Sequence, residues 1–151
     1  MISNEMGRWY EDYDVGETIL HSLSKTITES DNNLFCLLTM NHHPIHLNSQ
    51  YADQFGGILV VGTLVFSLTV GISVGDLSGK AIANLGYHDI KHLHPVRVGD
   101  TLYAYSEIIR KRESKTKQDR GIMTVRTIGK TSENAVISFE RDILIQKHYG
   151  S

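Results

Sequence analysis

The feature that most constrains the fold is a long apolar run, GILVVGTLVFSLTVGISVG, at residues 57–75. From about Gly62 to Leu77 the run is apolar on nearly all sides, and such a helix must be surrounded by protein. The run is long enough to cross a bilayer. However, Gly, Ser and Thr interrupt it throughout and no basic flank anchors it. We therefore predict a long buried helix and no membrane span.

After Gly79 the apolar pattern changes to a period of two. Four segments alternate in this way and are separated by short polar joints. They cover residues 81–96, 101–114, 121–130 and 134–147. Long consecutive strands with hairpin-type joints indicate an antiparallel sheet.

Before the apolar run we expect one strand and short helices. Residues 17–30 alternate well enough for a first strand. Residues 28–40 predict a helix, which a hydroxyl group at position 28 or 30 can cap. Pro44 prevents this helix from continuing, and residues 48–56 predict one or two helical turns that begin at Asn48. Three leucines share one face of the longer helix: Leu34, Leu37 and Leu38.

The economical packing of these elements wraps one antiparallel sheet around the buried helix, which is the hot-dog architecture. We predict an α+β fold with a single hot-dog domain over residues 1–151, a length that suits one core. Such a sheet covers only part of the helix and leaves open edges. Pairing with a second copy is therefore expected, as a homodimer, a dimer of dimers or a trimer of dimers.

Composition limits the possible partners. The formal net charge of −2 argues against a nucleic-acid binder, which would carry a basic face. Acidic residues interrupt the one basic segment, residues 108–120, so a solvated hairpin end is expected there. Cys36 is the only cysteine and lies in an apolar run, so we predict a buried, unreactive thiol. The N-terminus does not read as a secretory signal, and a cytoplasmic location is expected.

The segment TMNHHPIHLN, residues 39–48, holds three histidines. Pro44 breaks any helix that would align them, and no HExxH or Cys/His ligand pattern is present, so no metal site is predicted. The plain alternative for His46 is a loop histidine without a functional role. The plain alternative for Asn41 is a helix C-cap, because asparagine tolerates the left-handed conformation.

Three segments in order, residues 34–56, 56–71 and 92–102, resemble the MaoC-like dehydratases, the hydratase branch of the hot-dog superfamily. The family signature is a helix that ends in Asp, then Asn-Pro-x-His-x-Asp, a His-Gly that opens the central helix, and a strand with Arg-Pro-Val-x-x-Gly-Asp-x-Leu. The matching positions are Pro44-x-His46, Tyr51-Ala52, Gly62 and Pro95-Val96-x-x-Gly99-Asp100.

The family adds water to acyl-CoA thioesters or removes it, without a cofactor. The resemblance implies that His46 is the catalytic histidine and that Gly62 is the glycine whose amide polarises the thioester carbonyl. Asn41 stands where the family has its catalytic Asp. An amide cannot accept a proton at neutral pH, although it can hold a water molecule. We therefore expect His46 to take the proton from a water oriented by Asn41 and to return it to the α-carbon.

The remaining expectations concern the substrate. Five residues are expected to contact it: His43, Val61, Thr63, His94 and Arg97. Three histidines on one predicted strand, His88, His92 and His94, are expected to share a face.

Resemblance to branches that act on mesaconyl-CoA, β-methylmalyl-CoA or itaconyl-CoA favours a short polar or dicarboxylic acyl group. Two alternatives stay open, a hot-dog thioesterase and an inactive acyl-CoA binder. The thioesterase would need a carboxylate at the thioester, for which Glu29, Asp31 and Asp53 are the nearby candidates.

Overall fold

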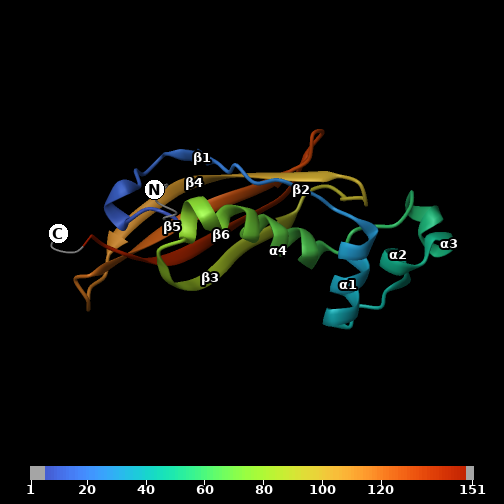
Figure 1. The fold of residues 1–151 in the computed structure, drawn as a ribbon, viewed down its shortest axis with the longest axis horizontal. Coiled ribbons are helices and arrows are strands. Elements are labelled where there is room, and N and C mark those ends of the chain that lie inside the picture. Colours follow the sequence, from blue (N-terminus) through green and yellow to red (C-terminus); the bar gives the residue numbers. More distant parts are fainter. Residues whose placement is uncertain (1–5, 149–151) are drawn as a thin grey trace, which may run out of the picture.

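The computed structural model describes residues 6–148, in which an antiparallel sheet curls around one central helix (Figure 1). The helices are η1 (Tyr10–Asp12), α1 (Glu29–Thr39), α2 (Pro44–Leu47), α3 (Ser49–Ala52), η2 (Asp53–Phe55), α4 (Gly62–Ser73) and the π-helical turn η3 (Val74–Ser78). The strands are β1 (Thr18–Leu20), β2 (Lys25–Thr26), β3 (Ala81–His92), β4 (Thr101–Glu113), β5 (Arg120–Lys130) and β6 (Ala135–Gln146). The predicted α+β hot-dog architecture is confirmed.

The strand order is β1-β4-β5-β6-β3, with β2 also paired to β4, and every pairing is antiparallel. The four long strands after the central helix match the prediction. The single first strand predicted over residues 17–30 is wrong, because it divides into β1 and β2. Leu20 lies opposite Tyr105 and Lys25 lies opposite Leu102. From Leu20 to Lys25 the chain advances five residues, whereas the paired positions on β4 advance only three, from Tyr105 to Leu102. The extra residues between β1 and β2 must therefore leave the sheet.

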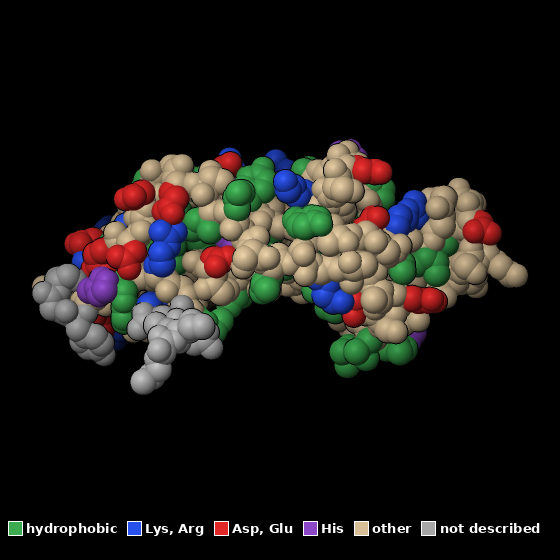
Figure 2. All heavy atoms as spheres, turned by 45° about the horizontal axis from the view of Figure 1, so that its top comes forward, with side chains coloured by type: hydrophobic (Ala, Val, Ile, Leu, Met, Phe, Trp, Pro, Cys, Tyr) green, Lys and Arg blue, Asp and Glu red, His purple; other side chains and the backbone are tan. Residues whose placement is uncertain are grey.

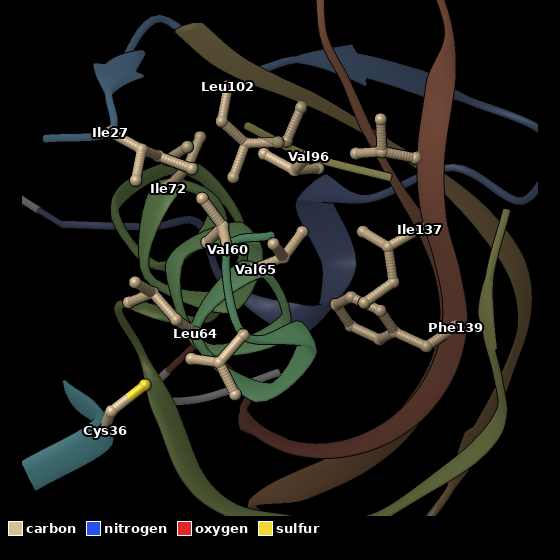
Figure 3. Packing of buried hydrophobic residues seen from close by; sticks show 13 residues of the cluster. Ile27, Cys36, Val60, Leu64, Val65, Ile72, Val96, Leu102, Ile137 and Phe139 are labelled. Atoms are coloured by element: carbon tan, nitrogen blue, oxygen red, sulfur yellow. The ribbon is translucent and has the colours of Figure 1, made fainter. Parts of the chain in front are cut away.

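The central helix fills the concave side of the sheet. Val65 of α4 lies on the side that faces Ile137 and Phe139 of β6 (Figure 3), and all three are buried in one apolar cluster. Burial of each such side chain contributes about 1.5–3 kcal/mol. The helix is not covered on all sides, since a stripe of small and polar residues is exposed: Thr63, Ser67 and Gly71. The sheet therefore covers part of the helix, as expected. No helix among residues 6–148 has both the length and the hydropathy for a membrane span.

Helix α1 begins with a reciprocal cap. The Oγ1 of Thr28 accepts from the Asp31 amide at 3.2 Å, and a carboxylate oxygen of Asp31 accepts from the Thr28 amide at 2.8 Å. The helix ends at Met40, which adopts the left-handed conformation with φ of 59°. The C-cap alternative for Asn41 is therefore wrong, because Met40 occupies that position.

The inward face of α1 carries Asn32 and Cys36, both fully buried. Burial raises the pKa of the Cys36 thiol, which agrees with the prediction of an unreactive cysteine. The shared leucine face points to solvent instead, and with Met40 it forms an apolar group that projects below the body of the molecule (Figure 2).

A bulge in β3 reverses the side of the sheet to which its residues point. His88 pairs with Glu140, whereas His92 pairs with Ile137, so an irregularity between His88 and Lys91 adds one residue. Asp89, within the bulge, has φ of 49°. Since 140 and 137 differ by an odd number, His88 and His92 lie on opposite faces. The predicted shared face is wrong for His88.

Candidate active site

A pocket of about 310 Å³ opens beside the N-terminal end of α4. Its lining joins elements that are far apart in the sequence: His46 from α2, Gly62 and Val65 from α4, His92 from β3, His94 just after β3, and Val136 from β6. The predicted catalytic pair His46 and Gly62 thus comes together in one pocket.

His46 is positioned by the short helix α2. Pro44 begins this helix, where its fixed φ favours the first turn. The Nδ1 atom of His46 lies 2.8 Å from the carbonyl oxygen of Leu59. A carbonyl only accepts, so Nδ1 carries the proton in this bond. The Nε2 lone pair of a neutral ring is then free to accept a proton from a molecule in the pocket.

Asn32 connects the histidine segment to the central helix. Its Nδ2 donates to the carbonyl oxygen of His46 at 3.0 Å, and its Oδ1 accepts from the Val61 amide at 3.0 Å. The side chain is fully buried, so the two bonds fix the spacing between His46 and the start of α4. Our sequence reasoning missed Asn32. The available signal was an asparagine in a helix interior, where this residue is unfavourable unless it has a specific partner.

Gly62 is the first residue of α4, and Val61 before it provides no side-chain cap. Across residues 6–148 we find no acceptor for the Gly62 amide. The N-terminal end of a helix carries a partial positive charge, so this amide is a donor for an anionic oxygen. A Cβ atom at position 62 would lie 2.8 Å from Cε1 of His92. A side chain at position 62 would therefore displace the neighbouring imidazole.

His92 and His94 both reach the pocket, but their surroundings differ. The Nδ1 atom of His94 lies 2.9 Å from the carbonyl oxygen of Ala135. Neither nitrogen of His92 has a hydrogen-bond partner in the part of the chain that the structure describes. From the sequence, His92 was expected to share a strand face with His88 and His94. The sequence did not reveal the bulge in β3, so the proximity of His92 to Gly62 could not be predicted.

Two of the predicted substrate residues are structural caps. His43 is the N-cap of α2, and its Nδ1 accepts from the Ile45 amide at 3.2 Å. Val61 is the buried N-cap residue of α4, and its amide donates to Asn32. Neither residue lines the pocket, although both lie next to residues that do.

Thr63, Arg97 and Asn41 also lie outside the pocket lining. Thr63 is exposed in the first turn of α4. The Arg97 guanidinium donates to the carbonyl oxygens of Gly57 and Phe55, the latter at 2.9 Å, and so fastens the end of η2. The Oδ1 of Asn41 accepts from the His43 amide at 3.3 Å in a local turn. The structure therefore does not bring Asn41 into the pocket with His46.

Among the residues that the structure describes, none that lines the pocket carries a carboxylate. Asp31, one of the thioesterase candidates, is bound at the start of α1, where its hydrogen bond to Lys25 lowers the pKa of this carboxyl to about 2. Among residues 6–148, no three His, Cys, Asp or Glu side chains are arranged to hold a metal ion. The polar side chains that line the pocket are the imidazoles of His46, His92 and His94.

The chain is similar to known proteins of one family. The family model of the MaoC like domain matches residues 12–131. A mesaconyl-CoA hydratase from Cereibacter sphaeroides is 35% identical over 144 residues, which are 93% of this chain and 42% of that protein. The (R)-specific enoyl-CoA hydratase from Rhodospirillum rubrum is 28% identical and covers 91% of each chain.

A solved structure, of a putative MaoC domain protein dehydratase from Chloroflexus aurantiacus, superposes with a TM-score of 0.91 at 30% identity. It covers 98% of this chain, which corresponds to 43% of that protein. The chain thus spans about two-fifths of the length of its mesaconyl-CoA hydratase relative. Because the family model covers most of the sequence and the fold agrees, the chain belongs to the MaoC-like domain family.

Proposed function

We propose that the chain is an acyl-CoA hydratase/dehydratase that adds water to an enoyl-CoA thioester or removes it. The observation that carries this proposal is the pairing of two groups in one pocket. Within residues 6–148, neither Nε2 of His46 nor the Gly62 amide has a hydrogen-bond partner, and both groups belong to residues that line the pocket. The first suits proton transfer, and the second suits a developing oxyanion.

In hydration, Nε2 of His46 takes a proton from water while the water oxygen bonds to the β-carbon. The π electrons move toward the thioester oxygen, and the Gly62 amide and the helix end stabilise the resulting negative charge. The imidazolium of His46 then gives its proton to the α-carbon. The double bond is consumed and His46 returns to its neutral form. Since the thioester itself accepts the electrons, this chemistry needs no cofactor.

The proposed mechanism uses one imidazole for both proton transfers. Asn41 cannot replace the carboxylate that the family has at this position, because an amide is not a base at neutral pH. Its Oδ1 is also engaged by the His43 amide. A role for Asn41 in holding the water therefore stays a prediction.

A short polar or dicarboxylic acyl group is the proposed substrate class. The relative named mesaconyl-CoA hydratase supports it, as does a pocket volume of about 310 Å³, near the small end of ligand sites. His94 at the pocket wall offers an imidazole to a carboxylate. Contacts of His43, Val61, Thr63 and Arg97 with the substrate stay predictions.

A homodimer is the proposed assembly. In the described residues β3 pairs only with β6, so its other edge is open. The exposed stripe of Thr63, Ser67 and Gly71 leaves α4 uncovered on one side. A second copy would cover both features, and its further association into larger assemblies stays a prediction, as does a cytoplasmic location.

The test is a panel of enoyl-CoA thioesters that includes mesaconyl-CoA and crotonyl-CoA. Loss of the enoyl-thioester absorbance without release of free thiol is expected. Release of thiol would instead favour the thioesterase alternative, although the pocket lining holds no carboxylate to support it. Binding of acyl-CoA without either reaction would favour the inactive binder.

A further inference from the structure

The edge of the His92 ring that carries both nitrogens lies close to Gly62, the first residue of α4. A Cβ atom at position 62 would lie 2.8 Å from Cε1, 3.1 Å from Nε2 and 3.3 Å from Nδ1 of this ring. These three atoms form one edge of the imidazole. Because Cα–Cβ bonds of a helix tilt toward its N-terminus, that edge lies at the helix end.

The fold places this ring on the side of the sheet that faces α4, where it borders the pocket although the residue itself is exposed. His92 pairs with Ile137, which is fully buried, and residues paired across an antiparallel ladder point to the same face. Without the bulge at Asp89, regular alternation would place His92 on the same outer face as His88, four residues before it. The irregularity therefore brings an imidazole to the pocket that a regular strand would turn away.

The other histidines of this region have assigned partners. His88 contacts the Asp142 carboxylate at 2.8 Å on the outer face, and His94 contacts the Ala135 carbonyl. For His92 we find no partner of either nitrogen within residues 6–148. An imidazole N–H beside the Gly62 amide is thus available to a bound molecule.

We propose that His92 donates a hydrogen bond to the thioester oxygen of the substrate, as a second donor beside the Gly62 amide. The inference rests on the proposed hydratase function. An oxyanion accepts more than one hydrogen bond, and each donor directed at it stabilises the negative charge that develops there. Both the neutral and the protonated imidazole carry an N–H group, so the role does not depend on one charge state.

Two substitutions separate hydrogen bonding from shape. His92→Phe keeps a planar ring and removes the donor, whereas His92→Gln keeps an N–H donor. Loss of one oxyanion donor is expected to lower kcat about 10²–10³-fold in His92→Phe, with partial recovery in His92→Gln. His88→Gln is the matched control, because it lies on the same strand and outside the pocket lining, and wild-type kcat is expected. Circular dichroism would establish that each variant is folded.

A second readout does not require turnover. Butyryl-CoA has no double bond to hydrate, so the infrared stretch of its thioester carbonyl reports hydrogen bonding in the bound state. We expect a shift to lower frequency in the wild-type protein, a smaller shift in His92→Phe and recovery in His92→Gln. An equal shift in wild type and His92→Phe would overturn the proposal.

The two proposals fail in different ways. If the wild-type protein hydrates no member of the panel but shows the His92-dependent carbonyl shift, the hydratase proposal fails and the His92 contact stands. If His92→Phe loses activity only toward dicarboxylic substrates, His92 binds the second carboxylate instead, and the oxyanion role is refuted. Absence of butyryl-CoA binding by the wild type, together with no hydration of any member of the panel, would contradict both.

Discussion

The buried bridge of Asn32 leads to the most specific stability prediction. Replacing Asn32 with Leu keeps a side chain of similar size and removes both hydrogen bonds, to the His46 carbonyl and from the Val61 amide. A buried polar group left without a partner costs about 1–3 kcal/mol. Two such groups give about 2–6 kcal/mol, and apolar packing of the leucine offsets part of it. We therefore expect a loss of about 3 kcal/mol in the free energy of unfolding.

Urea unfolding measures this loss directly. Asn33→Leu is the matched control, since Asn33 lies next on the same helix and its side chain has no hydrogen bond within residues 6–148. A change of no more than about 0.5 kcal/mol is expected for the control. A loss below about 1 kcal/mol in Asn32→Leu, or one equal to that of the control, would refute the idea that Asn32 fixes His46 to α4.

Three further predictions concern stability and the departure from the family motif. His21 is buried between Asp76 and Ser106, and burial lowers its pKa below the ordinary 6.5. The unfolded chain therefore binds a proton at His21 more readily than the folded chain, and the free energy of unfolding should fall as the pH drops below about 6.5. Urea unfolding midpoints measured across this pH range should show the fall in the wild type. In His21→Gln the contribution of this histidine to the fall should be absent. Thr28→Ala removes the cap of α1 and should cost about 1 kcal/mol in the same assay. Asn41→Asp should alter the hydration rate of crotonyl-CoA. An unchanged rate would show that Asn41 has no role in the reaction.

Local patterns predicted most of the fold. The apolar run and the period-two segments depend on residues close in sequence, so the central helix and four strands were placed almost correctly. The break between β1 and β2 and the bulge near Asp89 depend on pairing with β4 and β6. The alternation of residues within one strand does not reveal how that strand pairs with a distant strand. For this reason the face of His88 was predicted wrongly.

The site was predicted in part. The resemblance placed His46 and Gly62, and the structure brings both to one pocket. Arg97 instead fastens η2, because its side chain meets carbonyl groups from a loop about forty residues away. Asn32 and His92 were not assigned from the sequence, since each acts on a neighbour that only the folded chain supplies.

The central claim is that His46 moves the protons of the reaction, and His46→Ala tests it most directly. General acid–base catalysis by one side chain contributes about 10²–10⁴-fold, so kcat for the best enoyl-CoA of the panel should fall by at least about 10²-fold. Butyryl-CoA should still bind, and the His88→Gln control should retain wild-type kcat. Full hydration activity in a folded His46→Ala variant would contradict the account.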